Sequence, residues 1–299
     1  MTLQLPDTVR LVAGNGGLPR LDVSTRAATA EIYLHGAHVT AWQPAQAAAP
    51  VIWMSAASFF QPEKPIRGGV PICYPWFGPH PSDKSAPAHG FARLAEWRLD
   101  NVRTLRDGSV DLLLVLDPTS GSQTADARHA ATVAHRITIG AKLMMSLEVR
   151  NPGPDTLTFE EALHTYFAVQ DVTQIEICGL ENVEYLDKVA GFARKRQAAE
   201  PIRFTAETDR VYLDTTGACT LDDPGLLRRI VVSKSGSQST VVWNPWRDKA
   251  AAMPDFGNDE WRGMVCIETA NVGDAAVRLE PGERHVMTAE ISVTARTSA

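Results

Sequence analysis

Short alternations of apolar and polar residues run through most of the chain. In Ala134–Ile139 and in Val110–Leu116 every second side chain is apolar. Successive side chains of a strand point to opposite faces, so this period of two predicts β-strands with one buried face. The expected strands are Glu31–Leu34, Val39–Gln43, Val110–Leu116, Val133–Ile139, Leu143–Arg150, Leu157–Val169, Ile175–Ile177, Glu184–Leu186, Val211–Leu213, Ile230–Ser233, Thr240–Trp243, Met264–Glu268 and Val286–Val293.

Turn sequences rich in glycine and proline separate these runs, as at residues 151–154 and 280–283. Helical spacing is scarce, and only Asp248–Met253 could form a short helix. Many short strands with such turns are typical of a sandwich or barrel. No repeat or linker divides the 299 residues, so we expect an all-β fold, a sandwich or a barrel with little helix, as one domain over residues 1–299.

Two expected strands carry an ionisable residue on the face opposite their aliphatic side chains. Leu163 and Phe167 share one face, and His164 lies on the other. In the second strand Glu268 opposes Ile267 in the same way. A histidine and a carboxylate on polar faces of a sheet can move a proton at neutral pH, so an acid–base enzyme is the first hypothesis. Taken alone, each residue fits a structural role better: a histidine satisfied by backbone groups, or a solvated strand carboxylate.

The segment from residue 65 to residue 93 differs from an ordinary connection. It carries Arg67 and Arg93 with His89, several aromatic residues, and many prolines and glycines. Loops of this length in compact domains are often binding loops, and arginine can hold a phosphate through two parallel hydrogen bonds. The segment therefore suits a sugar with an anionic group. The alternative is a rigid, aromatic-packed crossover whose arginines cap carbonyl groups.

Charge and composition limit the partners. The net charge of −6 argues against a nucleic-acid or membrane-surface partner, although local arginines still allow a small anionic substrate. No apolar run approaches the length of a membrane span, and no signal sequence precedes the first strand, so we expect a cytoplasmic protein.

Metal ligation is not expected from the cysteines and histidines. Cys73, Cys178, Cys219 and Cys266 lack metal-site spacing and the density of a disulfide scaffold. Cys178 and Cys266 lie in apolar runs and are expected to be buried reduced thiols. His35 and His38 are three residues apart, which places them on opposite faces of a strand.

Several short motifs follow one another in a fixed order: Arg67–Pro71, His89–Arg93, Leu163–Phe167, Thr208–Tyr212, Trp243–Trp246 and Cys266–Glu268. Together they resemble the aldose 1-epimerase (mutarotase) superfamily, and specifically its glucose-6-phosphate 1-epimerase branch. The resemblance spans roughly residues 30–293. It implies a large antiparallel β-sandwich, the galactose mutarotase-like supersandwich, which binds sugar on its concave face.

The resemblance also implies roles for particular residues. Arg67, Arg93 and Asp209 would bind substrate, and His89 falls where the superfamily usually has a second active-site histidine. One position departs from the pattern, because some relatives carry a glutamine ligand where this chain has Ala88. That departure concerns one sugar or phosphate contact and leaves the chemistry intact.

His164 and Glu268 would form the catalytic pair. Glu268 would act as the base on the C1 hydroxyl and His164 as the acid on the ring oxygen. The reaction needs no cofactor and no metal, and the only partner expected for this monomer is a small-molecule sugar phosphate. The small apolar neighbours of Glu268, Cys266 and Ala270, would partly desolvate the carboxyl group and raise its pKa, which suits a base.

The expected function is an isomerase that interconverts the α and β anomers of a hexose 6-phosphate, with glucose 6-phosphate as the preferred candidate. One alternative is a mutarotase of unphosphorylated aldoses, and another is a non-catalytic carbohydrate-binding β-sandwich. A metal-dependent sugar isomerase of the cupin kind would require clustered His-x-His spacing, which the chain lacks.

Overall fold

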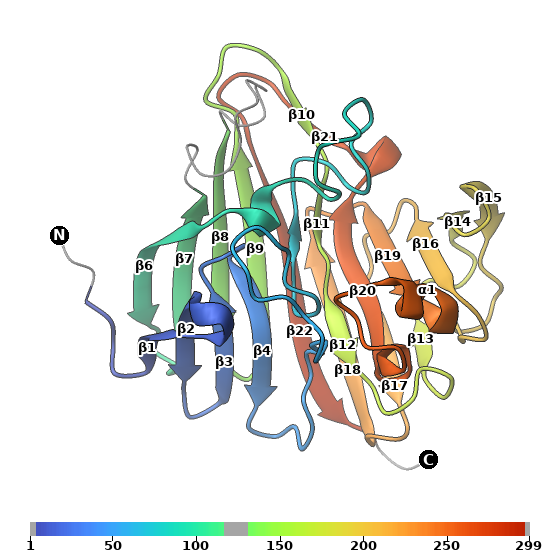
Figure 1. The fold of residues 1–299 in the computed structure, drawn as a ribbon, viewed down its shortest axis with the longest axis horizontal. Helices are drawn as coiled ribbons and strands as arrows, with labels where there is room; N and C mark the ends of the chain where they lie inside the picture. The colour runs from blue at the N-terminus through green and yellow to red at the C-terminus, as the bar shows by residue number, and fades with distance from the viewer. Residues whose placement is uncertain (1–3, 117–130, 297–299) are drawn as a thin grey trace.

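The structure, a computed structural model, describes residues 4–116 and 131–296. Its strands form antiparallel sheets stacked in two layers (Figure 1). One layer is an eight-stranded sheet in the order β13-β17-β18-β22-β9-β8-β7-β6. Its strands are β6 (Trp97–Thr104), β7 (Val110–Leu116), β8 (Thr132–Ile139), β9 (Leu143–Arg150), β13 (Glu176–Cys178), β17 (Cys219–Asp223), β18 (Arg228–Ser235) and β22 (Arg284–Ala295).

The second layer contains the sheet that carries the candidate catalytic residues, called the site sheet below. Its order is β15-β14-β16-β19-β20-β11-β5, and β12 also pairs with β20. Its strands are β5 (Ile72–Cys73), β11 (Glu161–Leu163), β12 (Tyr166–Ala168), β14 (Glu184–Asp187), β15 (Ala193–Arg196), β16 (Thr208–Tyr212), β19 (Ser239–Asn244) and β20 (Met264–Asn271).

A four-stranded sheet extends this layer through a single bridge between Val39 and Val70. Its strands are β1 (Val9–Ala13), β2 (Pro19–Ser24), β3 (Ala28–Tyr33) and β4 (His38–Pro44). A separate pair joins β10 (Leu157–Phe159) to β21 (Val277–Leu279), and the one α-helix in the described residues is α1 (Trp246–Ala252). The predicted all-β sandwich is confirmed, and no helix of the described segments is long and apolar enough to cross a membrane.

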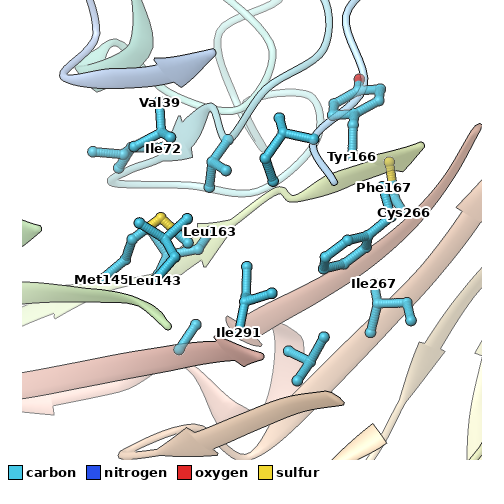
Figure 2. Packing of buried hydrophobic residues seen from close by; sticks show 14 of the residues in the cluster. Val39, Ile72, Leu143, Met145, Leu163, Tyr166, Phe167, Cys266, Ile267 and Ile291 are labelled. Atoms are coloured by element: carbon cyan, nitrogen blue, oxygen red, sulfur yellow. The ribbon is translucent and has the colours of Figure 1, made fainter. Parts of the chain in front are cut away.

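The hydrophobic core fills the space between the layers. Figure 2 shows Phe167 and Ile267 on the side of the site sheet that faces Ile291 of β22, whereas Tyr166 lies on the other side. Leu163 joins the same core and is fully buried. The alternation in the sequence therefore gave the correct inward faces, and it leaves the opposite face of the site sheet for polar side chains.

Some strands were predicted residue for residue, and one prediction was wrong. Val110–Leu116 and Leu143–Arg150 are β7 and β9. The expected continuous strand Leu157–Val169 is instead three strands, β10, β11 and β12. It breaks at Glu160, whose carboxylate accepts hydrogen bonds from the backbone N–H groups of loop residues, and again at residues 164 and 165.

Several strands were not predicted, and one of them lacks the alternation that prediction needs. β15 is exposed at every position, so its sequence carries no buried face. The strands outside the predicted set are β1, β2, β5, β6, β15, β17 and β21. The described cysteines are all free, as expected, but Cys178 is only half-buried, because it lies in the edge strand β13.

Candidate active site

Strand register places the two predicted catalytic residues opposite each other. Leu163 at the end of β11 pairs with Thr269 of β20, and β12 pairs with β20 in the same register beyond the break. His164, in that break, therefore faces Glu268, and directly opposed side chains share a face of the sheet. The His164 Nε2 and Glu268 Oε1 atoms are 3.3 Å apart, and both side chains are buried.

The pair lies at the bottom of a cavity of about 290 Å³ on the face of the site sheet that points away from the core. All the predicted site residues line it. The lining consists of Arg67, Phe77, Gly78, Pro79, Ala88, His89, Arg93, His164, Lys188, Asp209, Trp243, Lys249, Met253 and Glu268.

Neighbouring strands continue the same row of side chains. Asp209 of β16 pairs with Trp243 of β19, which in turn pairs with Cys266 of β20. All three side chains therefore share the face that carries Glu268. Trp243 packs in the core cluster, and its remaining surface also lines the cavity.

Burial dominates the electrostatics of the pair. It raises the pKa of Glu268 well above the ordinary value of 4.5, and the positive charge of Lys188 only partly opposes this shift. It lowers the pKa of His164 well below 6.5, and the positive charges of Arg93 and Arg67 lower it further. Both shifts favour the uncharged forms, a protonated carboxyl group beside a neutral imidazole.

Arg67 lines the cavity with its charge already compensated. Its Nε and Nη2 atoms lie 3.2 and 3.1 Å from the Asp255 carboxylate. Its Nη1 atom donates a 3.0 Å hydrogen bond to the Tyr166 hydroxyl. All three guanidinium nitrogens of Arg67 therefore have a protein partner before any ligand is bound.

Arg93 differs from Arg67 in having no carboxylate partner among the described residues. Its Nη2 atom donates a 2.7 Å hydrogen bond to the carbonyl of Ala88, and its buried Nε has no partner in that part of the chain. Burial lowers the pKa of Arg93, but guanidinium remains charged at any physiological pH. The cavity thus contains a partly buried positive charge that is not paired with any carboxylate of the described residues.

Asp209 forms an ion pair that the sequence did not predict. Lys188 Nζ lies 3.0 Å from its Oδ2 atom and 5.1 Å from the centre of the Phe77 ring. Burial raises the pKa of Asp209, and Lys188 opposes that rise. Lys188 follows β14 in a turn, where a lysine in sequence resembles any solvated loop cation. Lys249 of α1 was also missed, and it pairs with Glu207 at 2.8 Å.

His89 lies beside the catalytic pair. Its ring centre is 5.6 Å from that of His164, edge to face, and 4.7 Å from that of Phe77. Its Nδ1 atom is 3.3 Å from the Cys73 sulfur. Burial and the nearby positive charges lower the pKa of His89 well below 6.5, so the ring is neutral at pH 7. Its neighbour Ala88 offers the cavity a methyl group and a carbonyl already bonded to Arg93.

Known proteins are similar to this chain both in sequence and in fold. A family model described as aldose 1-epimerase matches residues 20–292. The chain belongs to the aldose 1-epimerase family.

Two relatives of this epimerase family are both named "Putative glucose-6-phosphate 1-epimerase". The one from Cenchrus ciliaris is 35% identical over 292 residues, which cover 94% of this chain and 86% of the relative. The one from Escherichia coli (strain K12) is 34% identical over 243 residues, which cover 81% and 79%. A crystal structure named as a "putative mutarotase" from Salmonella typhimurium is similar with a TM-score of 0.87 at 28% identity, covering 98% of this chain and 96% of that one. These findings confirm the predicted fold and the isomerase assignment.

Three buried side chains of the site could in principle bind a metal ion. Each of His164, Cys266 and Glu268 offers one ligand atom, and these atoms lie within 4.8 Å of one another. Burial raises the pKa of Cys266 well above 9.0 and that of Glu268 above its usual value, so both would have to lose a proton to bind a metal. The positive charges of Arg67 and Arg93 oppose a dication further. This epimerase site suits proton transfer better than metal ligation.

Proposed function

We propose that the protein interconverts the α and β anomers of a hexose 6-phosphate, with glucose 6-phosphate as its substrate. The observation that carries the proposal is the 3.3 Å approach of His164 Nε2 to Glu268 Oε1 at the bottom of a cavity that also contains Arg93. An acid and a base side by side can serve two oxygens of one pyranose. The names of the relatives from Cenchrus ciliaris and Escherichia coli support the choice of substrate.

The reaction requires two coupled proton transfers. Glu268 removes the proton of the C1 hydroxyl while His164 protonates the ring oxygen. The bond between C1 and the ring oxygen then breaks, leaving an aldehyde at C1 and a hydroxyl at C5. Rotation about the C1–C2 bond presents the other face of the aldehyde, and the reverse transfers close the ring and restore both residues.

The pair holds one proton throughout this cycle. Before ring opening the proton is on His164, and the pair is a carboxylate beside an imidazolium. After ring opening it is on Glu268, and both groups are uncharged. Burial favours the uncharged arrangement, as the pKa shifts of both groups indicate. The site therefore stabilises the state that accompanies the open-chain aldehyde, which is the least stable form of the sugar.

Charge in the cavity supports a phosphorylated substrate. We assign Arg93 and Arg67 to the phosphate, Asp209 to sugar hydroxyls as an acceptor, and His89 to a hydroxyl next to the reacting carbon. Arg93 is the principal anion ligand, because its charge is not already compensated by a described carboxylate. A single bound sugar phosphate needs no second subunit, and we expect a monomer working in the cytoplasm as one domain.

Magnetisation exchange between the two anomeric protons of glucose 6-phosphate tests the reaction directly. The wild-type protein should raise the exchange rate above its spontaneous value. His164→Asn and Glu268→Gln should each lower kcat about 10²–10⁴-fold with little change in KM. Glu290→Gln, a strand carboxylate outside the cavity, serves as the matched control. A wild-type rate equal to the spontaneous one would mean that the protein only binds sugar.

A further inference from the structure

We propose that Tyr166 is a positioning residue that fixes the imidazole plane of His164 by ring stacking. The inference rests on the proposed function, because it assigns a cause to the orientation of the proposed acid. Tyr166 would then be a second functional residue of the motif Leu163–Phe167, besides His164.

One ring nitrogen of His164 lacks the hydrogen bond that would orient the imidazole. A working histidine is usually oriented by a hydrogen bond from its second ring nitrogen to a carbonyl or carboxylate. Here Nε2 faces Glu268, and the buried Nδ1 of His164 has no hydrogen-bond partner among the described residues. The backbone of His164 itself favours the charged ring slightly, but it does not reach hydrogen-bonding geometry with Nδ1. Something other than a hydrogen bond must hold the plane of the ring.

Aromatic rings supply that restraint. The Tyr166 ring lies parallel to the imidazole of His164, with centres 4.9 Å apart and planes 17° apart. Trp53 stacks with the same tyrosine at 5.6 Å and 18°. Trp243 and His89 meet the imidazole edge-on, at 6.0 and 5.6 Å and 76° in both cases. Parallel and perpendicular contacts together leave the imidazole little freedom to tilt.

Tyr166 is itself held from its hydroxyl end. Its oxygen accepts the 3.0 Å hydrogen bond from Arg67 Nη1, and Asp255 fixes the other side of that guanidinium. The side chain of Tyr166 is almost fully buried. An unbroken set of contacts therefore runs from Asp255 through Arg67 and Tyr166 to the imidazole.

The same stack affects the charge of the acid. The face of an aromatic ring attracts a cation, so the Tyr166 ring favours the imidazolium that His164 must form before ring opening. Burial opposes that charge. Removing the ring should lower the pKa of His164 further and move the acidic limb of the kcat profile to lower pH.

The test compares ring removal with hydroxyl removal. Tyr166→Leu should lower kcat about 10- to 100-fold because a misplaced acid reacts poorly, with KM within about threefold. Tyr166→Phe keeps the ring and should retain kcat within about threefold. Tyr33→Leu is the matched control, since Tyr33 is equally buried, accepts one hydrogen bond from Asn15 and does not line the cavity. It should lower stability without lowering kcat.

Two outcomes would overturn the inference. One is a folded Tyr166→Leu variant with kcat within threefold of wild type, and the other is an equal loss in Tyr166→Phe, which would assign the effect to the hydroxyl. If Tyr166→Leu does not fold, Trp53→Leu removes the outer ring of the stack and should show a smaller loss of kcat at constant KM. His164→Asn, measured alongside, separates the two proposals: full activity there would refute the acid itself.

Discussion

At the scale of single residues, the cavity contains two arginines with different surroundings. Arg67 is engaged by Asp255 and Tyr166, whereas Arg93 bonds only the carbonyl of Ala88 within the described residues. A guanidinium with free donors can take a phosphate through two parallel hydrogen bonds. One already held by a carboxylate contributes less to a new anion.

Arg93→Met should therefore separate the two classes of sugar. Its kcat/KM for glucose 6-phosphate should fall by about two orders of magnitude, as expected for losing a charged hydrogen bond to phosphate, while that for free glucose changes little. Arg67→Met should lower both values, because it leaves the buried Tyr166 hydroxyl without its donor beside the proposed acid. It should separate the two sugars less than Arg93→Met does, because Arg67 is already held by Asp255. Steady-state rates on both sugars give the comparison, and equal losses in Arg93→Met would contradict the phosphate assignment.

The pH dependence of kcat follows from the buried pair. The active pair holds one proton, and a second proton, bound by His164, inactivates it. Because the pKa of His164 is lowered well below 6.5, the acidic limb of the kcat profile should lie below pH 6.5. The remaining proton is held more tightly than by an ordinary carboxyl group, because the pKa of Glu268 is raised well above 4.5. The anomeric exchange rate should be measured at saturating glucose 6-phosphate and corrected for catalysis by the buffer. Below neutral pH it should stay constant until that limb is reached. A decline that begins above pH 6.5 would contradict this assignment.

The residues of the site could be found from sequence where a motif or a strand face marked them. His164 and Glu268 stood out on polar faces, and the structure places them on one row of the sheet. Lys188 and Asp255 could not be found, because a loop residue carries no periodic pattern and its partners are distant in sequence. The role of Tyr166 depends on ring geometry, which sequence does not contain.

At the scale of elements, the break between β11 and β12 matters most. Alternation predicted a continuous strand, and it gave the correct faces because the register with β20 is the same on both sides of the break. It could not predict the interruption at residues 164 and 165. There the N–H of Thr165 donates to the nearby carbonyl of Leu163, and the N–H of His164 donates to the distant carbonyl of Pro71.

A partly buried ion pair joins β11 to the other layer. His285 Nε2 of β22 lies 3.0 Å from Glu161 Oε1, and Glu161 is fully buried. The hydrogen bond with Glu161 raises the pKa of His285 above 6.5, so protonated His285 stabilises the folded protein. That contribution is complete below pH 6.5, the value for the unfolded chain, and is lost as the pH rises through the folded pKa.

His285→Gln should consequently lower the free energy of unfolding by about 1–3 kcal/mol at acidic pH, the usual contribution of a charged hydrogen bond. The difference from wild type should shrink at alkaline pH, where the imidazole is neutral in both states. Urea unfolding at pH 5.5 and pH 9 measures both. A difference that does not change with pH would show that the ring acts only through packing.

At the scale of the whole molecule, the two layers are interleaved along the chain. The site sheet takes strands from residue 72 to residue 271, and the facing sheet takes strands from residue 97 to residue 295. Strand alternation and turn spacing were enough to predict an all-β fold, and the resemblance of the motifs to a known family chose the sandwich over the barrel. They could not give the strand order, because pairing between distant strands depends on the packed layers and leaves no local pattern.

Interleaving predicts one cooperative unit. Thermal unfolding should show a single transition whose calorimetric and van't Hoff enthalpies agree. Fragments divided at Gly153 should not fold alone, since each would lack strands from both sheets. Two resolved transitions, or a folded fragment, would contradict the one-domain proposal.

The bottom of the cavity and its walls are made by different kinds of element. The proposed base lies in β20 and the proposed acid in the short break between β11 and β12, which both pair with β20, whereas Phe77, His89 and Lys188 come from connecting segments. Connecting segments tolerate change better than paired strands do. Exchange of these segments between homologues should therefore alter which sugar is accepted and leave the residues that open the ring in place. The scaffold is for that reason a convenient starting point for redesigning selectivity.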